Sequence, residues 1–556
     1  MTEAKQIHIG DYLLTRLREC GIESIFGVPG DFNLPLLEQL MHREDLRWVG
    51  NCNELNAAYA ADGYARKQGA GALIVTYGVG DLSAINGIAG SFAEHVPVVC
   101  ISGIPPLHAV RKRMLLHHTS GTGNLEDVLH AMAQFTAAQS RITPGNAAAE
   151  IDRVLCTAMR EKRPVYLQIP SDIFEFSIPA PTQPLDLVQP QPDPRQLARV
   201  VDEIEARLAK AKQPVLLVDA DVQRFGLRET ISKLGEARGI PFTTLTSGRS
   251  IFDEQHPLYR GIYGGDGSPA AELVEGSDCL LAVGVRFFDA TTGIYTHEVD
   301  EHNMILIDPF SVSFGERSYE GVTAESVLDA LIARSHCSAG RESIAPRKKA
   351  LVTALAEEPQ ARLTHKNLWP RMQQFLRSGD VILAEAGTSF AGISGISLPS
   401  GVDFISQSLW GSIGFTLPAT LGLMMAEPAR RHLLFIGDGS LQMTAQEIST
   451  MVREGCKPVL FVVNNDGYTI ERMIYGPQSG YNDIHRWNYG KLVELFDPAG
   501  KSRAHTVRTV GELDAVLNQL EDPASLTIVE LMMERMDAPQ NLVAMGKRCA
   551  EFDFGA

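Results

Sequence analysis

The sequence lacks the features of disulfide-rich, zinc-binding and membrane proteins. Its eight cysteines are scattered, with no CxxC pair and no histidine-rich stretch beside them, so we expect free or buried thiols in a reducing compartment. No uninterrupted apolar run reaches the roughly 18 residues that a membrane-spanning helix needs. The first residues have neither the basic start nor the apolar core of a signal peptide. We therefore expect a cytoplasmic protein that does not enter a membrane.

Positive charge is also scarce. Fifty lysine and arginine residues stand against 67 aspartate and glutamate residues, and the resulting formal charge of -17 is spread along the chain without a basic stripe. Such a surface repels a phosphate backbone, so nucleic acid is not an expected partner. No GxGxxG motif opens a helix after the first predicted strand, which argues against a nicotinamide dehydrogenase.

The sequence does have enough apolar material for several buried sheets. Its 556 residues, 44% of them hydrophobic, exceed what one core holds. Apolar runs rich in β-branched residues alternate with helical periodicity, which is typical of parallel sheets with helices on both faces. We therefore predict an α/β fold of three successive doubly wound parallel-sheet domains. A proline-rich stretch near 178–194 and a polar stretch near 335–362 set the predicted boundaries: 1–180, 195–340 and 360–556.

Short apolar runs give the clearest strand signals. They cover residues 24–28, 72–76, 96–101, 164–169, 214–218, 279–283, 304–307, 431–436 and 457–463. A helix is predicted over 444–454, between the last two of these strands.

Polar motifs follow the last two of these strands. Gly437-Asp438-Gly439-Ser440 closes the first, and Asn464-Asn465 closes the second, so both should emerge at the sheet edge where open α/β folds bind ligands. Asp438, the amide oxygen of Asn465 and a main-chain carbonyl near Gly467 offer hard oxygen ligands, which suit Mg²⁺ or Ca²⁺ and not zinc. Either motif alone is most simply a strand-ending turn. Together, at this spacing, they favour a site for a metal and a diphosphate.

The two motifs resemble the fingerprint of thiamine-diphosphate enzymes, with 24 residues from Ser440 to Val463 between them. Other segments resemble the 2-oxo acid decarboxylase branch of that family, which includes pyruvate, indolepyruvate, phenylpyruvate and branched-chain 2-oxo acid decarboxylases. These segments are 27–31, 53–57, 78–80, 117–119, 410–414 and 465–472. The resemblance implies decarboxylation of a 2-oxo acid to an aldehyde and carbon dioxide through an enamine on thiamine diphosphate, with Mg²⁺ as the metal.

The resemblance also implies which residues bind the cofactor. Glu54 matches the acid that protonates the pyrimidine N1′, and Ile413 matches the apolar wedge that bends the cofactor. Gly411 would offer its carbonyl to the 4′-amino group. The remaining implied contacts are Thr76, Thr388, Gly439 and Ser440, with Asp438, Asn465 and Gly467 as metal ligands. On sequence alone, Glu54 could equally be a glutamate on a helix surface.

A mixed set of side chains matches the family's acid-base cluster: Asp31, His117, His118 and Glu471. Such a set can hold different protonation states side by side. Each member also has a structural alternative. Asp31 could cap a helix starting at Phe32, Glu471 could pair with Arg472 on a surface, and two adjacent histidines could be solvated. Only their joint occurrence argues for catalysis.

Five side chains are implied around the tail of the substrate: Ala386, Phe390, Ala391, Ile470 and Met545. Relatives often carry glutamine or threonine in place of Ala386 and a second aromatic in place of Ala391. Both departures remove volume. We therefore expect branched, aromatic or medium-to-long-chain 2-oxo acids to be favoured over pyruvate, unless neighbouring side chains fill the space.

The family resemblance implies a homodimer or homotetramer, because Glu54 lies in the first unit, Asp438 lies in the third, and the family joins these units from different subunits. The alternative function is a carboligase that resembles acetolactate synthase or benzaldehyde lyase and shares the cofactor. The His117-His118 pair argues against it, because it supplies the proton that ends the reaction as an aldehyde. A sensor that only binds the cofactor would have lost Glu54 or the acid-base cluster.

Overall fold

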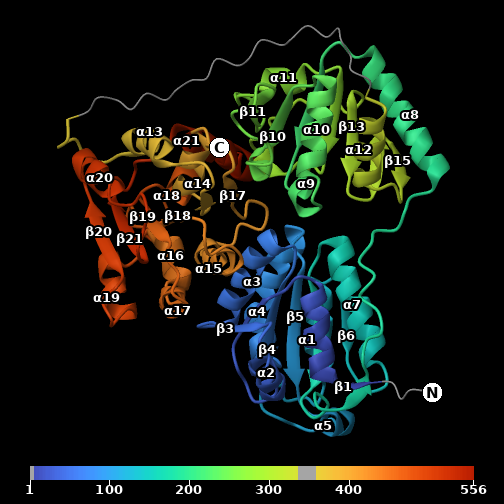
Figure 1. Ribbon diagram of the computed structural model, residues 1–556. Coiled ribbons are helices and arrows are strands. Elements are labelled where there is room, and N and C mark those ends of the chain that lie inside the picture. The colour runs from blue at the N-terminus through green and yellow to red at the C-terminus, as the bar shows by residue number, and fades with distance from the viewer. Residues whose placement is uncertain (1–4, 336–357, 556) are drawn as a thin grey trace.

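The computed structural model describes residues 5–335 and 358–555 and contains three units, each built on a largely parallel sheet (Figure 1). The N-terminal unit is blue to cyan, the middle unit is green to yellow-green, and the C-terminal unit is gold to red. Helices cover both faces of these sheets. The predicted α/β class with three doubly wound sheets is confirmed.

The N-terminal unit has the strand order β3-β2-β4-β5-β7-β6. Its strands are β2 (Ser24–Gly27), β3 (Arg47–Gly50), β4 (Gly71–Thr76), β5 (Val98–Ile104), β6 (Ala138–Arg141) and β7 (Val165–Pro170). Its helices are α1 (Ile9–Glu19), α2 (Leu34–Met41), α3 (Glu54–Gln68), α4 (Val79–Ala93), α5 (Leu107–Lys112), α6 (Asp127–Ala133) and α7 (Ala147–Glu161). An antiparallel pair, β1 (Gln6–His8) with β8 (Ser177–Pro179), ties the two ends of the unit together.

The middle unit follows residues 180–193, which are described and hold no helix or strand. Its strand order is β11-β10-β9-β12-β13-β14-β15, and the last two strands run antiparallel to their neighbours. The strands are β9 (Pro214–Val218), β10 (Phe242–Leu245), β11 (Tyr259–Tyr263), β12 (Cys279–Val283), β13 (Met304–Asp308), β14 (Ser311–Phe314) and β15 (Arg317–Glu320). The helices are α8 (Pro194–Lys210), α9 (Asp221–Arg224), α10 (Arg228–Arg238), α11 (Ala271–Glu275) and α12 (Ala324–Ala333), with the 3₁₀ turns η1 (Thr246–Gly248) and η2 (Asp289–Thr291). Most of the second predicted linker, residues 336–357, lies outside the described residues.

The C-terminal unit has the strand order β17-β16-β18-β19-β21-β20. Its strands are β16 (Val381–Ala384), β17 (Asp403–Ile405), β18 (His432–Gly437), β19 (Val459–Asn464), β20 (Arg503–Val507) and β21 (Thr527–Met532). The helices are α13 (His365–Phe375), α14 (Thr388–Ser394), α15 (Thr416–Ala426), α16 (Asp438–Thr444), α17 (Glu447–Arg453), α18 (Thr469–Ile474), α19 (Leu492–Phe496), α20 (Val510–Leu517) and α21 (Gln540–Phe554), with η3 (Gly480–Asn482) and η4 (Tyr489–Lys491).

The predicted strands are confirmed to within three residues at their ends, because continuous Val, Ile and Leu runs are buried on both faces of a parallel sheet. The predicted helix over 444–454 is wrong at its start. Helix α16 begins at Asp438 itself, and a break before Glu447 separates it from α17. Gly437 and Gly439 flank this helix start. Because glycine is a poor helix former, the sequence pattern did not indicate a helix there.

The N-terminal and C-terminal sheets share one topology, in which the strands follow the chain order second, first, third, fourth, sixth, fifth. In each sheet the connections change direction between the first and third strands, and open α/β sheets bind ligands at this switch point. Helices α3 and α15 join the two units, and Figure 1 shows them side by side. Their backbones nearly touch, because a Cβ on Gly63 would lie 2.3 Å from the Ala419 carbonyl oxygen.

Candidate active site

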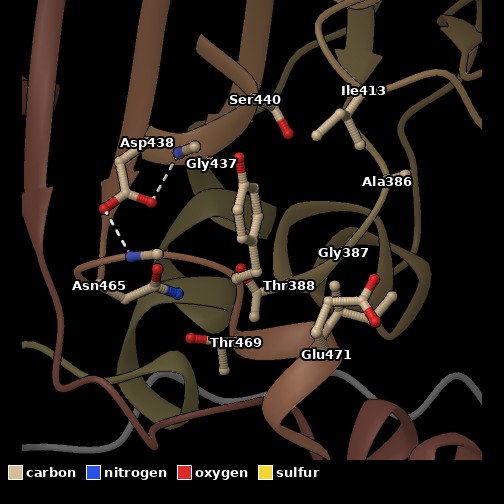
Figure 2. Close-up of a pocket in the computed structure, with 14 residues that line it drawn as sticks. Ala386, Gly387, Thr388, Ile413, Gly437, Asp438, Ser440, Asn465, Thr469 and Glu471 are labelled. Atoms are coloured by element: carbon tan, nitrogen blue, oxygen red, sulfur yellow. Dashed lines mark hydrogen bonds between the residues drawn. The ribbon is translucent and has the colours of Figure 1, made fainter. Parts of the chain in front are cut away.

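A pocket of about 270 Å³ opens at the switch point of the C-terminal sheet (Figure 2). Strands β18 and β19 are parallel neighbours with Gly437 opposite Val463, so Asp438 and Asn465 lie together at the carboxyl edge. The wall is formed by Ala386, Gly387, Thr388, Ile413, Gly437, Asp438, Gly439, Ser440, Asn465, Gly467, Tyr468, Thr469, Ile470 and Glu471. The predicted convergence of the two motifs at one sheet edge is confirmed.

Two polar groups in this pocket fit a hard divalent cation. Asp438 is 1% exposed, and its carboxylate accepts hydrogen bonds from the main-chain N–H groups of Gly439 at 2.8 Å and Gly467 at 3.2 Å. Burial raises the pKa of Asp438 to about 6. The Oδ1 atom of Asn465 is buried and has no hydrogen-bond partner among the described residues. A bound cation would stabilise the ionised carboxylate and satisfy the amide oxygen.

Small and hydroxyl-bearing residues shape the rest of the pocket. Thr388 and Ser440 are each 6% exposed and line the wall. A Cβ on Gly439 would lie 2.5 Å from the ring of Tyr468, so this turn requires glycine. The two hydroxyls and the open backbone suit an anionic diphosphate.

A buried carboxylate holds the loop that carries Ile413 against the pocket. Glu385 accepts hydrogen bonds from the Thr416 hydroxyl at 2.7 Å and from the main-chain N–H groups of Gly414 and Ala386, both at 3.2 Å. Burial raises the pKa of Glu385. Ile413 consequently lies on the wall, whereas Gly411 lies outside it, exposed and in a left-handed conformation with φ of 64°.

A second cluster lies at the switch point of the N-terminal sheet. Asp31 follows β2, and its Oδ2 is 2.8 Å from the Nε2 of His117. The ring centroids of His117 and His118 are 4.6 Å apart, and Phe32 stacks on His117 at 5.0 Å. The ligand atoms of the three polar residues lie within 4.8 Å of one another. The structure therefore brings together three of the four predicted acid-base residues.

Glu54 and Thr76 lie at the same switch point. Glu54 is the first residue of α3 and half-buried, and its Oε1 would be 3.4 Å from a Cβ on Gly80. No hydrogen bond joins its carboxylate to the described residues. Thr76 ends β4 and is 5% exposed, and its hydroxyl has no partner in the described part of the chain. Gly78 lets the His118 backbone pack closely against this edge, because a Cβ at residue 78 would lie 1.9 Å from the His118 carbonyl oxygen.

Two structural alternatives for the acid-base residues are wrong. Helix α2 begins at Leu34 with Asn33 as its N-cap, so Asp31 caps no helix at Phe32. Arg472 is 2% exposed and donates to main-chain carbonyls and to Asp483, whereas Glu471 is exposed and lines the pocket. The two side chains therefore point in different directions.

The predicted site residues fall into two separate groups in one chain. The pocket wall contains only residues from 386 to 471 among those described, and Asp31, Glu54, Thr76, His117 and His118 are not on it. The prediction missed Gly387, Gly437, Tyr468 and Thr469. All four adjoin residues that were predicted, so their proximity to the motifs was the available signal.

Three of the five residues predicted around the substrate tail are not on the pocket wall. Phe390 packs against the core beside Phe404, with ring centroids 6.2 Å apart. Ala391 is 7% exposed and its carbonyl accepts a hydrogen bond from Asn541 of α21. Met545 lies half-buried on α21, which packs against α18. Ala386 and Ile470 remain as the wall residues of this set.

Comparison with known proteins adds the family of the chain. Profiles of the thiamine pyrophosphate enzymes match each unit: the N-terminal TPP binding domain over residues 7–131, the central domain over 201–330 and the C-terminal TPP binding domain over 387–531. The fold and the site therefore define a thiamine pyrophosphate enzyme. No helix in the described part of the chain is long and apolar enough to cross a membrane.

Curated relatives match over nearly the whole chain. Pyruvate decarboxylase isozyme 1 of Saccharomyces cerevisiae is 41% identical, over 98% of this chain and 99% of the relative. Pyruvate decarboxylase of Candida glabrata is 40% identical, over 99% of both chains. Alpha-keto-acid decarboxylase of Mycobacterium leprae is 40% identical, over 97% of this chain and 95% of the relative. The chain belongs to the thiamine-diphosphate-dependent 2-oxo acid decarboxylase family.

Proposed function

We propose that this chain decarboxylates 2-oxo acids without oxidation, giving an aldehyde and carbon dioxide, with thiamine diphosphate and Mg²⁺. The observation that carries the proposal is the pairing of the buried Asp438 with the unsatisfied Asn465 amide oxygen in one pocket. A charged oxygen and an amide oxygen beside two hydroxyls match the needs of a hard divalent cation with a diphosphate.

The C-terminal pocket would hold the cofactor. Asp438, Asn465 and the carbonyl of Gly467 would bind the metal, while Thr388 and Ser440 contact the diphosphate. Ile413 would press on the middle of the cofactor, with the Gly411 carbonyl near its amino group. When bound, the cofactor supplies a positive thiazolium that accepts the electrons released with carbon dioxide.

The N-terminal cluster would supply the proton chemistry. Glu54 would hold a proton at the pyrimidine N1′, and Thr76 lies beside it at the same sheet edge. Asp31, His117 and His118, together with Glu471 from the pocket, would pass a proton to the carbon that becomes the aldehyde. His117 turns its Nε2 toward the Asp31 carboxylate. The other ring nitrogen therefore faces away from the carboxylate and can exchange a proton.

Neither half-site is complete within one chain. We propose that Glu54 and the acid-base cluster of one chain meet the Asp438 pocket of another, in a homodimer or homotetramer. Among the described residues, none from the N-terminal unit lies on the pocket wall, so a partner chain could supply the missing residues at its mouth. We also propose that the three sheets mark domains at 1–180, 195–340 and 360–556, since the family profiles fall within these limits.

The substrate is proposed to be a branched, aromatic or medium-to-long-chain 2-oxo acid. Ala386 and Ile470 form the apolar wall beside Glu471, and the small Ala386 leaves room for a longer tail. Each additional buried methylene adds about 0.8 kcal/mol, close to fourfold in kcat/KM. Ala391→Phe is a poor probe of this space, because Ala391 lies beneath α21.

The test measures aldehyde release from pyruvate, 2-oxooctanoate, phenylpyruvate and indolepyruvate, with and without Mg²⁺ and cofactor. We expect kcat/KM for 2-oxooctanoate to exceed that for pyruvate by roughly tenfold or more in the parent, the gain from burying about two of its additional methylenes, and Ala386→Gln to reverse the order. Ala386→Gly is the matched control and should keep the parent ratio. A parent that prefers pyruvate, or the same ratio in Ala386→Gln, would refute the substrate proposal and leave the decarboxylase proposal intact.

A further inference from the structure

The loop that carries the metal ligands, residues 465–467, has an unusual backbone. Asp466 is left-handed with φ of 58°, and Gly467 has φ of 126°. A left-handed non-glycine residue costs free energy, so the surrounding structure must hold it. At Gly467 a Cβ would lie 2.2 Å from the Asn482 carbonyl oxygen, so the loop is also pressed against η3. Its conformation is therefore imposed by its neighbours.

The buried Arg472 of α18 binds this loop through hydrogen bonds from its guanidinium. Its Nη1 donates to the Asn465 carbonyl at 3.2 Å, and its Nη2 donates to the Asp466 carbonyl at 2.6 Å. The same guanidinium binds the Asn482 carbonyl at 3.1 Å and pairs with Asp483 at 3.1 Å. The residue is 2% exposed. These bonds use the carbonyls of Asn465 and Asp466 and leave the Asn465 amide oxygen without a partner.

Arg486 holds the same loop from the outside. Its Nε donates to Oδ1 of Asp466 at 2.6 Å, and its Nη2 contacts Oδ2, which makes the pair bidentate. The Arg486 side chain is 60% exposed. A bidentate arginine fixes the direction of a carboxylate as well as its position, so Arg486 restrains Asp466 in its left-handed conformation.

We propose that Arg472, supported by Arg486, is a positioning residue that sets the Asn465–Gly467 loop in its metal-binding shape before the metal arrives. The proposal rests on the proposed function, in which this loop binds Mg²⁺. Arg472 does not lie on the pocket wall. Because it lies next to Glu471 on α18, it also ties the loop to the helix that carries the acid-base glutamate. Preorganisation of this kind raises affinity by reducing what must be ordered on binding.

The experiment titrates Mg²⁺ into metal-free protein at fixed thiamine diphosphate and follows cofactor binding by tryptophan fluorescence and by calorimetry. We expect Arg472→Gln to raise the half-saturating Mg²⁺ concentration on the order of tenfold, and Arg486→Gln about threefold. Arg472→Lys should fall between the parent and Arg472→Gln. At saturating Mg²⁺ and cofactor, kcat should stay within about threefold of the parent, which separates positioning from catalysis.

Arg431→Gln is the matched control. Arg431 is also a buried arginine of the C-terminal unit, with its side chain 8% exposed, and it pairs with Asp380 and donates to two carbonyls away from the pocket. It should lower the melting temperature without changing the Mg²⁺ midpoint.

An unchanged midpoint in Arg472→Gln, or an equal shift in Arg431→Gln, would overturn the proposal. If Arg472→Gln does not fold, the exposed Arg486 decides: an unchanged midpoint there overturns the proposal. A parent that shows no Mg²⁺-dependent cofactor binding refutes the proposed function instead.

Discussion

Replacing Asp438 with alanine is expected to abolish retention of thiamine diphosphate. Asp438 is the charged residue among the proposed metal ligands, and its removal leaves a doubly anionic diphosphate beside an empty metal site. Loss of one partner from a buried charged pair weakens an interaction by on the order of a hundredfold or more. The measurement is the amount of cofactor that stays bound through gel filtration, together with aldehyde release, and both should vanish.

The same substitution should not unfold the protein. Burial raises the pKa of Asp438 to about 6, which is above its value in the unfolded chain. Without metal, the carboxyl therefore favours folding while it is protonated at low pH, and this contribution is lost as the pH rises through about 6. At neutral pH, the metal-free Asp438→Ala protein should melt no lower than the metal-free parent. Asp438→Asn keeps the shape without the charge and should bind cofactor weakly. Tightly bound cofactor in Asp438→Ala would remove Asp438 from the metal site.

Glu54→Gln is expected to keep the cofactor but lose its activation. The amide has the shape of the carboxyl yet cannot deliver a proton to the pyrimidine N1′. Hydrogen-deuterium exchange at C2 of the bound cofactor, followed by NMR after acid quench, should slow by about two to four orders of magnitude. Cofactor affinity should stay close to that of the parent.

Glu54→Asp provides the comparison for this test, because it keeps the acid on a shorter side chain. The Glu54→Asp variant should retain part of the exchange rate, because it keeps an acid at this position. In the parent, no hydrogen bond with the described residues holds the Glu54 carboxylate in another direction. Exchange in Glu54→Gln as fast as in the parent would remove Glu54 from the proposed role.

The sequence predicted the strands and the grouping of the metal-site residues well, for a physical reason. Buried parallel strands are continuous apolar runs, so their ends are visible, and neighbouring strands bring the residues after them to one edge. Asp438 and Asn465 could therefore be placed together before their sheet was known. The polar edge strand β20, with the sequence Arg503-Ala-His-Thr-Val507, gave no comparable signal.

Packing between elements could not be predicted from local sequence. Phe390 lies on α14, a short helix with the core on one side and the pocket on the other. The Phe390 side chain points to the core, where it packs against Phe404, and this contact is not visible in the local sequence. Ala391 is covered by α21, which is distant in sequence and reaches it through Asn541. From the sequence, Arg472 looks like a surface residue beside Glu471. Only the structure shows that it donates hydrogen bonds to the carbonyls of Asn465 and Asp466.

Mixing the two inactive variants tests the central claim most directly. Glu54→Gln chains and Asp438→Ala chains are unfolded together, refolded with Mg²⁺ and thiamine diphosphate, and assayed for aldehyde release from a 2-oxo acid. If each site takes Glu54 from one chain and Asp438 from another, random pairing restores about one quarter of the sites, and activity should return to about one quarter of the parent level. Each variant refolded alone should stay inactive. Mixed chains that remain as inactive as the separate variants, while the refolded parent recovers, would contradict a decarboxylase site shared between two chains.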